Sequence, residues 1–142
     1  YLADKKNAAA LKSYEAAYTA KPSDNTVRMA LGIAYQQAKQ WSNAFKHFRA
    51  WTVQDDLAGA AWYQIGRTSA LSGQLQDEGI AALKRYLKMP HAANEPQNEN
   101  AYYRLGQLYA KADKKPEAKL AFQSALKLDP NYKDAKVELA KL

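Results

Sequence analysis

The sequence predicts an all-α fold of stacked antiparallel helix hairpins, and three observations support this prediction. A Leu-Gly or Ile-Gly pair recurs along the chain, prolines recur on the same spacing, and apolar residues follow helical periodicity between them. Glycine and proline number only 6 and 5 among 142 residues, so long regular elements are expected. One helix hairpin cannot bury its apolar face alone, which is why several hairpins are expected to pack side by side.

The glycines set the length of the repeat. Gly66 follows Gly32 by 34 positions, and Gly106 follows Gly66 by 40 positions. The prolines keep the same steps, since Pro22 and Pro90 are separated by twice the first interval and Pro130 follows Pro90 by the second. Two residue types therefore agree on a 34-residue repeat with one six-residue insertion, which must lie after Pro90 in the polar stretch 91–98.

This period divides the chain into hairpins. We expect a single domain over residues 1–142 that contains, in order, the second helix of a truncated repeat (1–24), a repeat (25–58), a repeat (59–92), an insertion (93–98), a repeat (99–132) and a C-terminal capping helix (133–142). In the capping helix, Val137, Leu139 and Ala140 are expected to face the stack, with Lys and Glu residues outside.

The third repeat carries a dense motif of small, bulky and aromatic residues. Its members are Tyr102, Leu105, Gly106, Tyr109, Ala118, Phe122, Ala125 and Pro130. This pattern resembles the tetratricopeptide repeat (TPR), in which a bulky residue, Leu-Gly and Tyr lie on a first helix and Ala, an aromatic residue and Pro follow on a second. The resemblance implies a right-handed α-α superhelix, the TPR solenoid, with a concave groove lined by first helices.

The other repeats match the motif less closely. Residues 25–58 carry Arg28, Trp51 and Asp56 at three motif positions. In residues 59–90 the second helix fits only if its register slips by one, which gives Gly79, Leu83 and Tyr86. The large Trp51 and Tyr86 side chains are expected to pack between helices rather than to bind a ligand.

Glycine within a helix needs a compensating reason. It costs about 0.5–1 kcal/mol relative to alanine. We expect Gly32, Gly66 and Gly106 to offset that cost by letting the two helices of a hairpin approach closely, with Ala44 and Ala118 completing the contact.

The family geometry implies which residues line the groove. They are Met29, Ile33, Gln36, Tyr63, Gln64, Arg67, Asn100, Tyr103, Arg104, Gln107 and Lys111. Tyr and Arg are enriched at binding hot spots, and a guanidinium can bind a carboxylate through two hydrogen bonds. We therefore expect a protein or peptide partner with an acidic group near Arg67 and Arg104. The alternative, that these are solvated residues without a ligand, remains open.

Some relatives hold an acidic C-terminal peptide of chaperones in a clamp of lysines, asparagines and an arginine. Here Met29 and Ile33 stand where the first Lys and Asn should be, and Asn100 replaces the second Lys. Arg104 matches, with Gln64 as a partial substitute, so the resemblance does not extend to that specificity.

An enzyme is not expected. The chain has no cysteine, its histidines are His47 and His91, and no glycine-rich phosphate loop or metal-spaced cluster occurs, so no cofactor is expected either. The array could alternatively be the docking arm of a larger multidomain protein or enzyme. The insertion could contact a partner, although a tolerated surface loop is the favoured interpretation.

Charge makes nucleic acid the less favoured partner. The net charge of +7 is spread thinly, at +1 for residues 1–24, +2 for 25–58, +1 for 59–98 and +3 for 99–142. A nucleic-acid-binding helical repeat therefore remains only an alternative.

No apolar run suggests a membrane span, and we expect a soluble protein of cytoplasmic or periplasmic location. The flank of residues 6–20 has no first helix to cover it, so association of two copies of the chain through this flank, as a homo-oligomer, is a further alternative.

Overall fold

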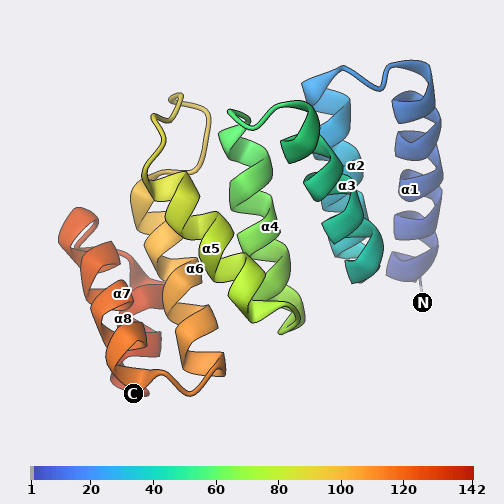
Figure 1. Ribbon diagram of the computed structural model, residues 1–142. Coiled ribbons are helices and arrows are strands. Elements are labelled where there is room, and N and C mark those ends of the chain that lie inside the picture. Colours follow the sequence, from blue (N-terminus) through green and yellow to red (C-terminus); the bar gives the residue numbers. More distant parts are fainter. Residues whose placement is uncertain (1) are drawn as a thin grey trace. The chain divides into compact units, whose positions relative to one another are not determined.

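A computed structural model describes residues 2–142, with side chains from Asp4 onward. The described residues form helices and turns, without a β-strand (Figure 1). The contacts divide the chain into two compact units, residues 1–56 and 57–142, and each is described by itself. No helix within residues 2–142 combines the length and the apolar character that crossing a membrane requires.

Unit 1 contains three helices. They are α1 (Leu2–Ala20), α2 (Asn25–Gln37) and α3 (Trp41–Gln54), and α2 packs against both of the others. Asp24 caps α2, because its Oδ1 accepts hydrogen bonds from the backbone N–H groups of Thr26 and Val27. Leu11 of α1 and Leu31 of α2 are buried together, so this pair joins the first two helices.

Unit 2 contains five helices in succession. They are α4 (Gly59–Ser72), α5 (Gln76–Leu87), α6 (Asn98–Lys111), α7 (Lys115–Leu128) and α8 (Lys133–Ala140). Each packs on the next, and α4 also contacts α6, so these two first helices of neighbouring hairpins lie side by side (Figure 1). Two apolar clusters form the core: one joins α4, α5, α6 and Ala121 of α7 around Leu83 and Leu108, and the other joins α6, α7 and α8 around Phe122.

The repeated glycines lie where the helices of a hairpin cross. A Cβ atom at Gly32 would come within 2.1 Å of the Phe48 ring, and one at Gly106 would come within 2.5 Å of the Phe122 ring. At Gly66 the neighbour is Leu83, at 2.2 Å, which confirms the register slip predicted for the second helix of that repeat. Since no side chain fits in these spaces, the expected close approach within each hairpin is confirmed.

The bulky departures from the motif are core residues, as predicted. Trp51 is 4% exposed, and Tyr86 is fully buried. Ala44 and Ala118 are fully buried as well. These side chains fill the spaces between helices and are too deeply buried to contact a ligand on the surface.

The capping helix differs from the expectation. Val137 is 52% exposed and Ala140 is exposed, so the prediction that they face inward was wrong. Ala135 is fully buried instead, and Leu139 packs on the same cluster. The reason is the helical phase: Ala135 and Leu139 are four residues apart and share one face, whereas Val137 lies two residues from each.

The loop between α5 and α6 is tied to the helices that it connects. The Tyr86 hydroxyl donates a hydrogen bond to the Pro96 carbonyl at 2.6 Å, and the His91 ring stacks on the Tyr86 ring with centroids 4.0 Å apart. His91 Nε2 lies 2.6 Å from Asn98 Oδ1 at the start of α6. Asn98, expected within the insertion, is thus the first residue of the helix. These contacts hold the loop at both of its ends.

Candidate functional site

The predicted groove residues of unit 2 come together on α4 and α6. Tyr63, Gln64 and Arg67 lie on α4, and the members from α6 are Asn100, Tyr103, Arg104, Gln107 and Lys111. Tyr63, Gln64 and Tyr103 are buried, at 5%, 7% and 9% exposed. The accessible part is therefore made by Arg67, Asn100, Arg104, Gln107 and Lys111, which we call the α4–α6 surface.

Arg104 is held in place by its own helix. Its Nη1 donates a hydrogen bond to Gln107 Oε1 at 3.0 Å, and Gln107 Nε2 donates in turn to the Tyr103 hydroxyl at 3.1 Å. The guanidinium carbon lies 5.5 Å from the centre of the Tyr103 ring, which is within the range of a cation–π contact. The positions of these three side chains on one helix, at spacings of three and four residues, explain why they can interact.

The two arginines of this surface act on each other. Burial lowers the pKa of Arg67, and the positive charge of nearby Arg104 lowers that pKa further. Arg104 Nε is buried and has no hydrogen-bond partner among the described residues. A buried donor without a partner costs about 1–3 kcal/mol. A negatively charged acceptor on the accessible side of the two guanidinium groups would relieve the repulsion between them.

Tyr132 belongs to this site, although it was not predicted there. Its hydroxyl donates a hydrogen bond to Asn100 Oδ1 at 2.9 Å, and its ring stacks on Tyr103 with centroids 5.2 Å apart. Burial raises the pKa of Tyr132 to about 12, with smaller contributions that include Tyr63. The side chain thereby contacts the α6 part of the α4–α6 surface.

The sequence did contain a signal for Tyr132. It is the N-cap residue of α8, and it follows Asp24, the N-cap residue of α2, by three repeats and the insertion. Asp is a favoured capping residue, whereas Tyr is not among the preferred types. Tyr132 makes no side-chain capping bond. A residue unsuited to its local position indicates a tertiary role, which here is its contact with Asn100 and Tyr103.

Lys111 has a structural contact as well as an exposed position. Its Nζ donates a hydrogen bond to the Ala70 carbonyl, near the C-terminus of α4. The last carbonyl groups of a helix have no partner within the helix, and a cation there is favourable. Lys111 therefore links α6 to the end of α4.

The predicted groove residues of unit 1 lie on α2. Met29 and Ile33 are half-buried, whereas Gln36 is 4% exposed. Met29 and Ile33 are four residues apart and share one helix face. This face is more apolar than the α4–α6 surface and contains no arginine from the predicted set.

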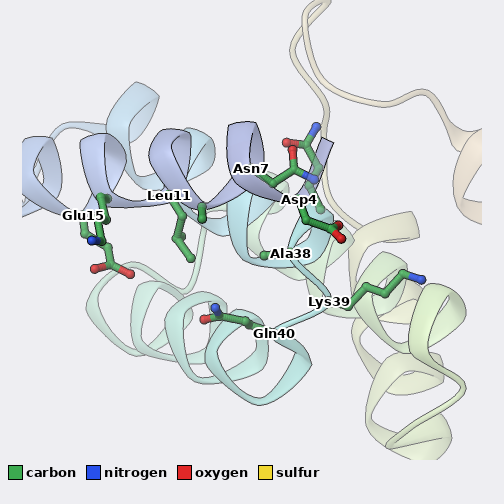
Figure 2. A pocket seen from close by; sticks show the side chains of 10 residues that line it. Asp4, Asn7, Leu11, Glu15, Ala38, Lys39 and Gln40 are labelled. Atoms are coloured by element: carbon green, nitrogen blue, oxygen red, sulfur yellow. The ribbon is translucent and has the colours of Figure 1, made fainter. Parts of the chain in front are cut away.

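Unit 1 also contains a cavity of about 550 Å³ beside α1. Its walls are the Asp4–Glu15 part of α1 and the turn from Gln37 to Gln40 (Figure 2). In Figure 2, Leu11 and Glu15 leave α1 on the side that faces Gln40. The lining mixes the carboxylates of Asp4 and Glu15 with the ammonium groups of Lys12 and Lys39, so it carries both signs of charge.

Comparisons with known proteins agree with this helical architecture. Two family models described as tetratricopeptide repeat match the chain, one at residues 1–58 and the other at residues 99–132. No curated protein matches the chain in sequence.

Solved structures share the fold at low sequence identity. Two crystal structures of MamA match with TM-scores of 0.74 and 0.75, each at 20% identity. The matches cover 91% and 95% of this chain, and 72% and 70% of the respective MamA chains. The structure of YrrB is described as that of a TPR protein with an unusual peptide-binding site, and it matches with a TM-score of 0.78 at 19% identity. The match covers 100% of this chain and 70% of the YrrB chain. At these identities the likeness concerns the helical solenoid alone.

Proposed function

Because the chain belongs to the tetratricopeptide-repeat family, whose members are protein-interaction modules, we propose that it binds a peptide segment of a partner protein on the α4–α6 surface. The peptide carries an acidic group, either an Asp or Glu side chain or its own terminal carboxylate, that binds between Arg67 and Arg104. YrrB, which is similar in fold, is described by its peptide-binding site, and this supports a peptide as the kind of ligand.

The Arg104 guanidinium, held by Gln107 beside the positive charge of Arg67 on a partly accessible surface, is the observation that carries this proposal. Arg67 and Arg104 repel each other, and burial weakens the solvation of Arg67, so a carboxylate near both is favoured. The Gln107 contact fixes the Arg104 side chain before a ligand arrives, which lowers the entropic cost of binding. A carboxylate can accept two hydrogen bonds from one guanidinium, and this geometry gives specificity for acidic groups.

The surroundings of the two arginines suit a peptide. The rings of Tyr63 and Tyr103 are buried below the accessible side chains. The centroid of the Tyr63 ring lies 5.4 Å from that of the core residue Tyr86. Asn100 and Gln107 offer amide groups that can bond to a peptide backbone. The site thus combines a charged anchor with amide donors and acceptors on two rigid helices.

Selection from a random peptide library displayed on phage tests this proposal. We expect the selected peptides to be enriched in Asp, Glu or a free C-terminus. Their affinity, measured by fluorescence polarisation, should fall about tenfold or more in the Arg67→Gln/Arg104→Gln variant, which corresponds to about 1.4 kcal/mol or more.

A matched control separates the site from the general charge of the protein. The Lys119→Gln/Lys127→Gln variant removes the same two positive charges from the exposed side of α7 and should bind the selected peptides as the original chain does. The proposal fails if both double variants lose affinity equally, or if the selected peptides show no enrichment in acidic groups.

A further inference from the structure

A second cleft in unit 1 gathers aromatic rings and hydrogen-bond acceptors. It has a volume of about 450 Å³ and lies between α1, α2 and α3. Its walls include Glu15 and Tyr18 from α1, Tyr35 from α2, and Lys46 and His47 from α3. We call it the α1–α3 cleft.

The α1–α3 cleft is distinct from the predicted groove. The residues of α2 that line it are Leu31 and Tyr35, whereas the groove was predicted at Met29, Ile33 and Gln36, of which Gln36 is buried. Positions two residues apart on a helix differ by about 200° around its axis. The cleft therefore opens on the opposite side of α2 from the predicted groove face.

Two tyrosine rings are arranged around His47. The Tyr18 ring lies edge-on to the imidazole at 5.1 Å between centroids, and the Tyr35 ring lies edge-on at 6.0 Å. Tyr18, Tyr35 and His47 are half-buried, so each ring is partly accessible from the cleft. The faces of tyrosine rings are negative and attract cations.

His47 adds an acceptor rather than a positive charge. Its Nε2 lies 2.7 Å from the Arg28 carbonyl oxygen, which can only accept, so Nε2 carries the proton. Burial lowers the pKa of His47, and although the bond to the Arg28 carbonyl raises it, the net shift is downward. The imidazole is therefore neutral near pH 7, and its Nδ1 has a lone pair that can accept a hydrogen bond.

Glu15 supplies the negative charge. Its carboxylate forms no ion pair or hydrogen bond with the described residues, and it lines both the α1–α3 cleft and the cavity in Figure 2. It lies close enough to Tyr35 to raise the pKa of that hydroxyl, after the larger effect of burial. Among the described residues that line the α1–α3 cleft, Lys46 is the one cation, and it is exposed.

We propose that the α1–α3 cleft binds a basic side chain of a partner protein, a lysine ammonium or an arginine guanidinium, between the Glu15 carboxylate and the rings of Tyr18 and Tyr35. The carboxylate accepts charge-assisted hydrogen bonds from the cation, and the tyrosine faces attract it. An anion would meet Glu15 and the negative ring faces, and would have in its favour the exposed ammonium group of Lys46 and the charge of Arg28, which acts on His47 from outside the lining. This site is independent of the acidic-peptide site proposed on unit 2.

Titration of capped tripeptides into the intact chain tests this inference. The probes are Ac-Gly-Lys-Gly-amide and Ac-Gly-Arg-Gly-amide, and Ac-Gly-norleucine-Gly-amide is the uncharged control. Binding is followed by NMR through the aromatic ring signals of Tyr18, Tyr35 and His47. We expect saturable shifts of these signals with both basic peptides and not with the norleucine peptide.

Charge-changing variants identify the group that holds the cation. Glu15→Gln should weaken binding of the lysine peptide about two- to fivefold, the range for an exposed ion pair, and Lys46→Gln should strengthen it by a similar factor. Glu117→Gln, an exposed carboxylate on α7, is the matched control and should change nothing. Because all three positions are exposed on helices, circular dichroism should show the same helix content in each variant.

Three results would overturn the inference. They are equal shifts with the norleucine and lysine peptides, unchanged affinity in Glu15→Gln, and saturable shifts confined to residues outside the α1–α3 cleft. The Arg67→Gln/Arg104→Gln variant should bind the basic peptides as the original chain does, so failure of this site and failure of the unit 2 site can be told apart.

Discussion

The hairpins α4–α5 and α6–α7 solve one packing problem in two ways. In α6–α7, Gly106 admits the ring of Phe122 from the second helix. In α4–α5, Gly66 admits Leu83, which lies one position further from its glycine than Phe122 does from Gly106. The close approach is present in both hairpins, while the side chain that fills it and its distance along the sequence differ.

The extra residue of α4–α5 lies at the end of α4, since the two turns, residues 73–75 and 112–114, have the same length. Helix α4 continues six residues past Gly66 to Ser72, whereas α6 continues five residues past Gly106 to Lys111. The α4–α5 turn has positive φ at Gly73 and Leu75, whereas the α6–α7 turn has it at Asp113. The helix crossing is thus kept, α4 is longer by one residue past its glycine, and the backbone of the turn differs accordingly.

The largest expected effect comes from filling the crossings. Gly106→Ala and Gly66→Ala each place a methyl group where core atoms lie within 2.5 Å or less. Because a packed core cannot expand freely, we expect each to lower the free energy of unfolding by about 2–3 kcal/mol, measured by urea denaturation. The loss in Gly106→Ala/Phe122→Ala should be smaller than the sum of the losses in the two single variants, because removal of the ring leaves room for the methyl group.

An opposite result at either glycine would break the comparison. Alanine is favoured over glycine within an unstrained helix by about 0.5–1 kcal/mol. If Gly66→Ala were stabilising while Gly106→Ala were not, only the α6–α7 crossing would depend on close approach. The two hairpins would then differ in packing and not only in register.

A smaller effect is expected at the turns. Gly73 has φ of 73° and nothing near a Cβ position, so Gly73→Ala meets backbone strain without a clash. We expect it to lower the free energy of unfolding by about 1–2 kcal/mol. Asp113→Gly, with φ of 59° at the original residue, should instead raise it by less than about 1 kcal/mol, because glycine relieves the strain but gains entropy when unfolded.

Thermal unfolding of both turn variants gives the comparison. Both substitutions act on a residue with a left-handed backbone, but Gly73→Ala is expected to lower the free energy of unfolding and Asp113→Gly to raise it. Opposite signs would confirm that the two turns are alternative solutions to one geometry. Destabilisation by Asp113→Gly would mean that the Asp113 side chain has a stabilising role in its turn.

Tyr132 offers a prediction that depends on pH. Tyr132→Phe removes the hydrogen bond to Asn100 and should cost about 0.5–1.5 kcal/mol near pH 7. The pKa of Tyr132 is raised to about 12 from 10, so the folded chain holds this proton more tightly than the unfolded chain. Its contribution is fully present below pH 10 and is lost as pH rises from 10 through 12.

The measurement compares thermal midpoints at pH 9 and pH 11. The original chain should lose more stability over this interval than Tyr132→Phe does. Tyr14→Phe is the control, because Tyr14 is 40% exposed and lies outside the α4–α6 surface. Equal losses in the original chain and in Tyr132→Phe would show that the proton of Tyr132 is not held by the fold.

Repetition explains how much of the fold could be predicted from the sequence. The recurring interval between Gly32 and Gly66 indicated the number of hairpins, and the slip to Leu83 was visible because Gly79 and Tyr86 slipped with it. The phase of α8 could not be predicted in the same way. Its short sequence offers apolar residues at Ala135, Val137 and Leu139, and only packing against α7 selects which of them are buried.

The candidate site was less predictable for a physical reason. Position on a first helix indicates direction but not burial, so Tyr63 and Arg67 were predicted together although Tyr63 is in the core. The Tyr132 contact with Asn100 joins residues from different helix hairpins. The His47 bond to the Arg28 carbonyl, which makes the α1–α3 cleft an acceptor site, is a tertiary contact that no local pattern indicates.

The smallest expected effect concerns self-association through the α1 flank, residues 6–20. Stable dimers usually bury about 800 Å² on each partner, with an apolar centre. On this flank the large exposed apolar side chain within the described residues is Tyr14, and Lys6 and Lys12 lie on the same helix. We therefore expect a weak dimer in sedimentation equilibrium that becomes tighter from about 0.05 to about 0.5 M salt, because salt screens the repulsion between lysines. Tyr14→Asn should abolish it, and an association that persists in this variant would have to use a surface other than the α1 flank.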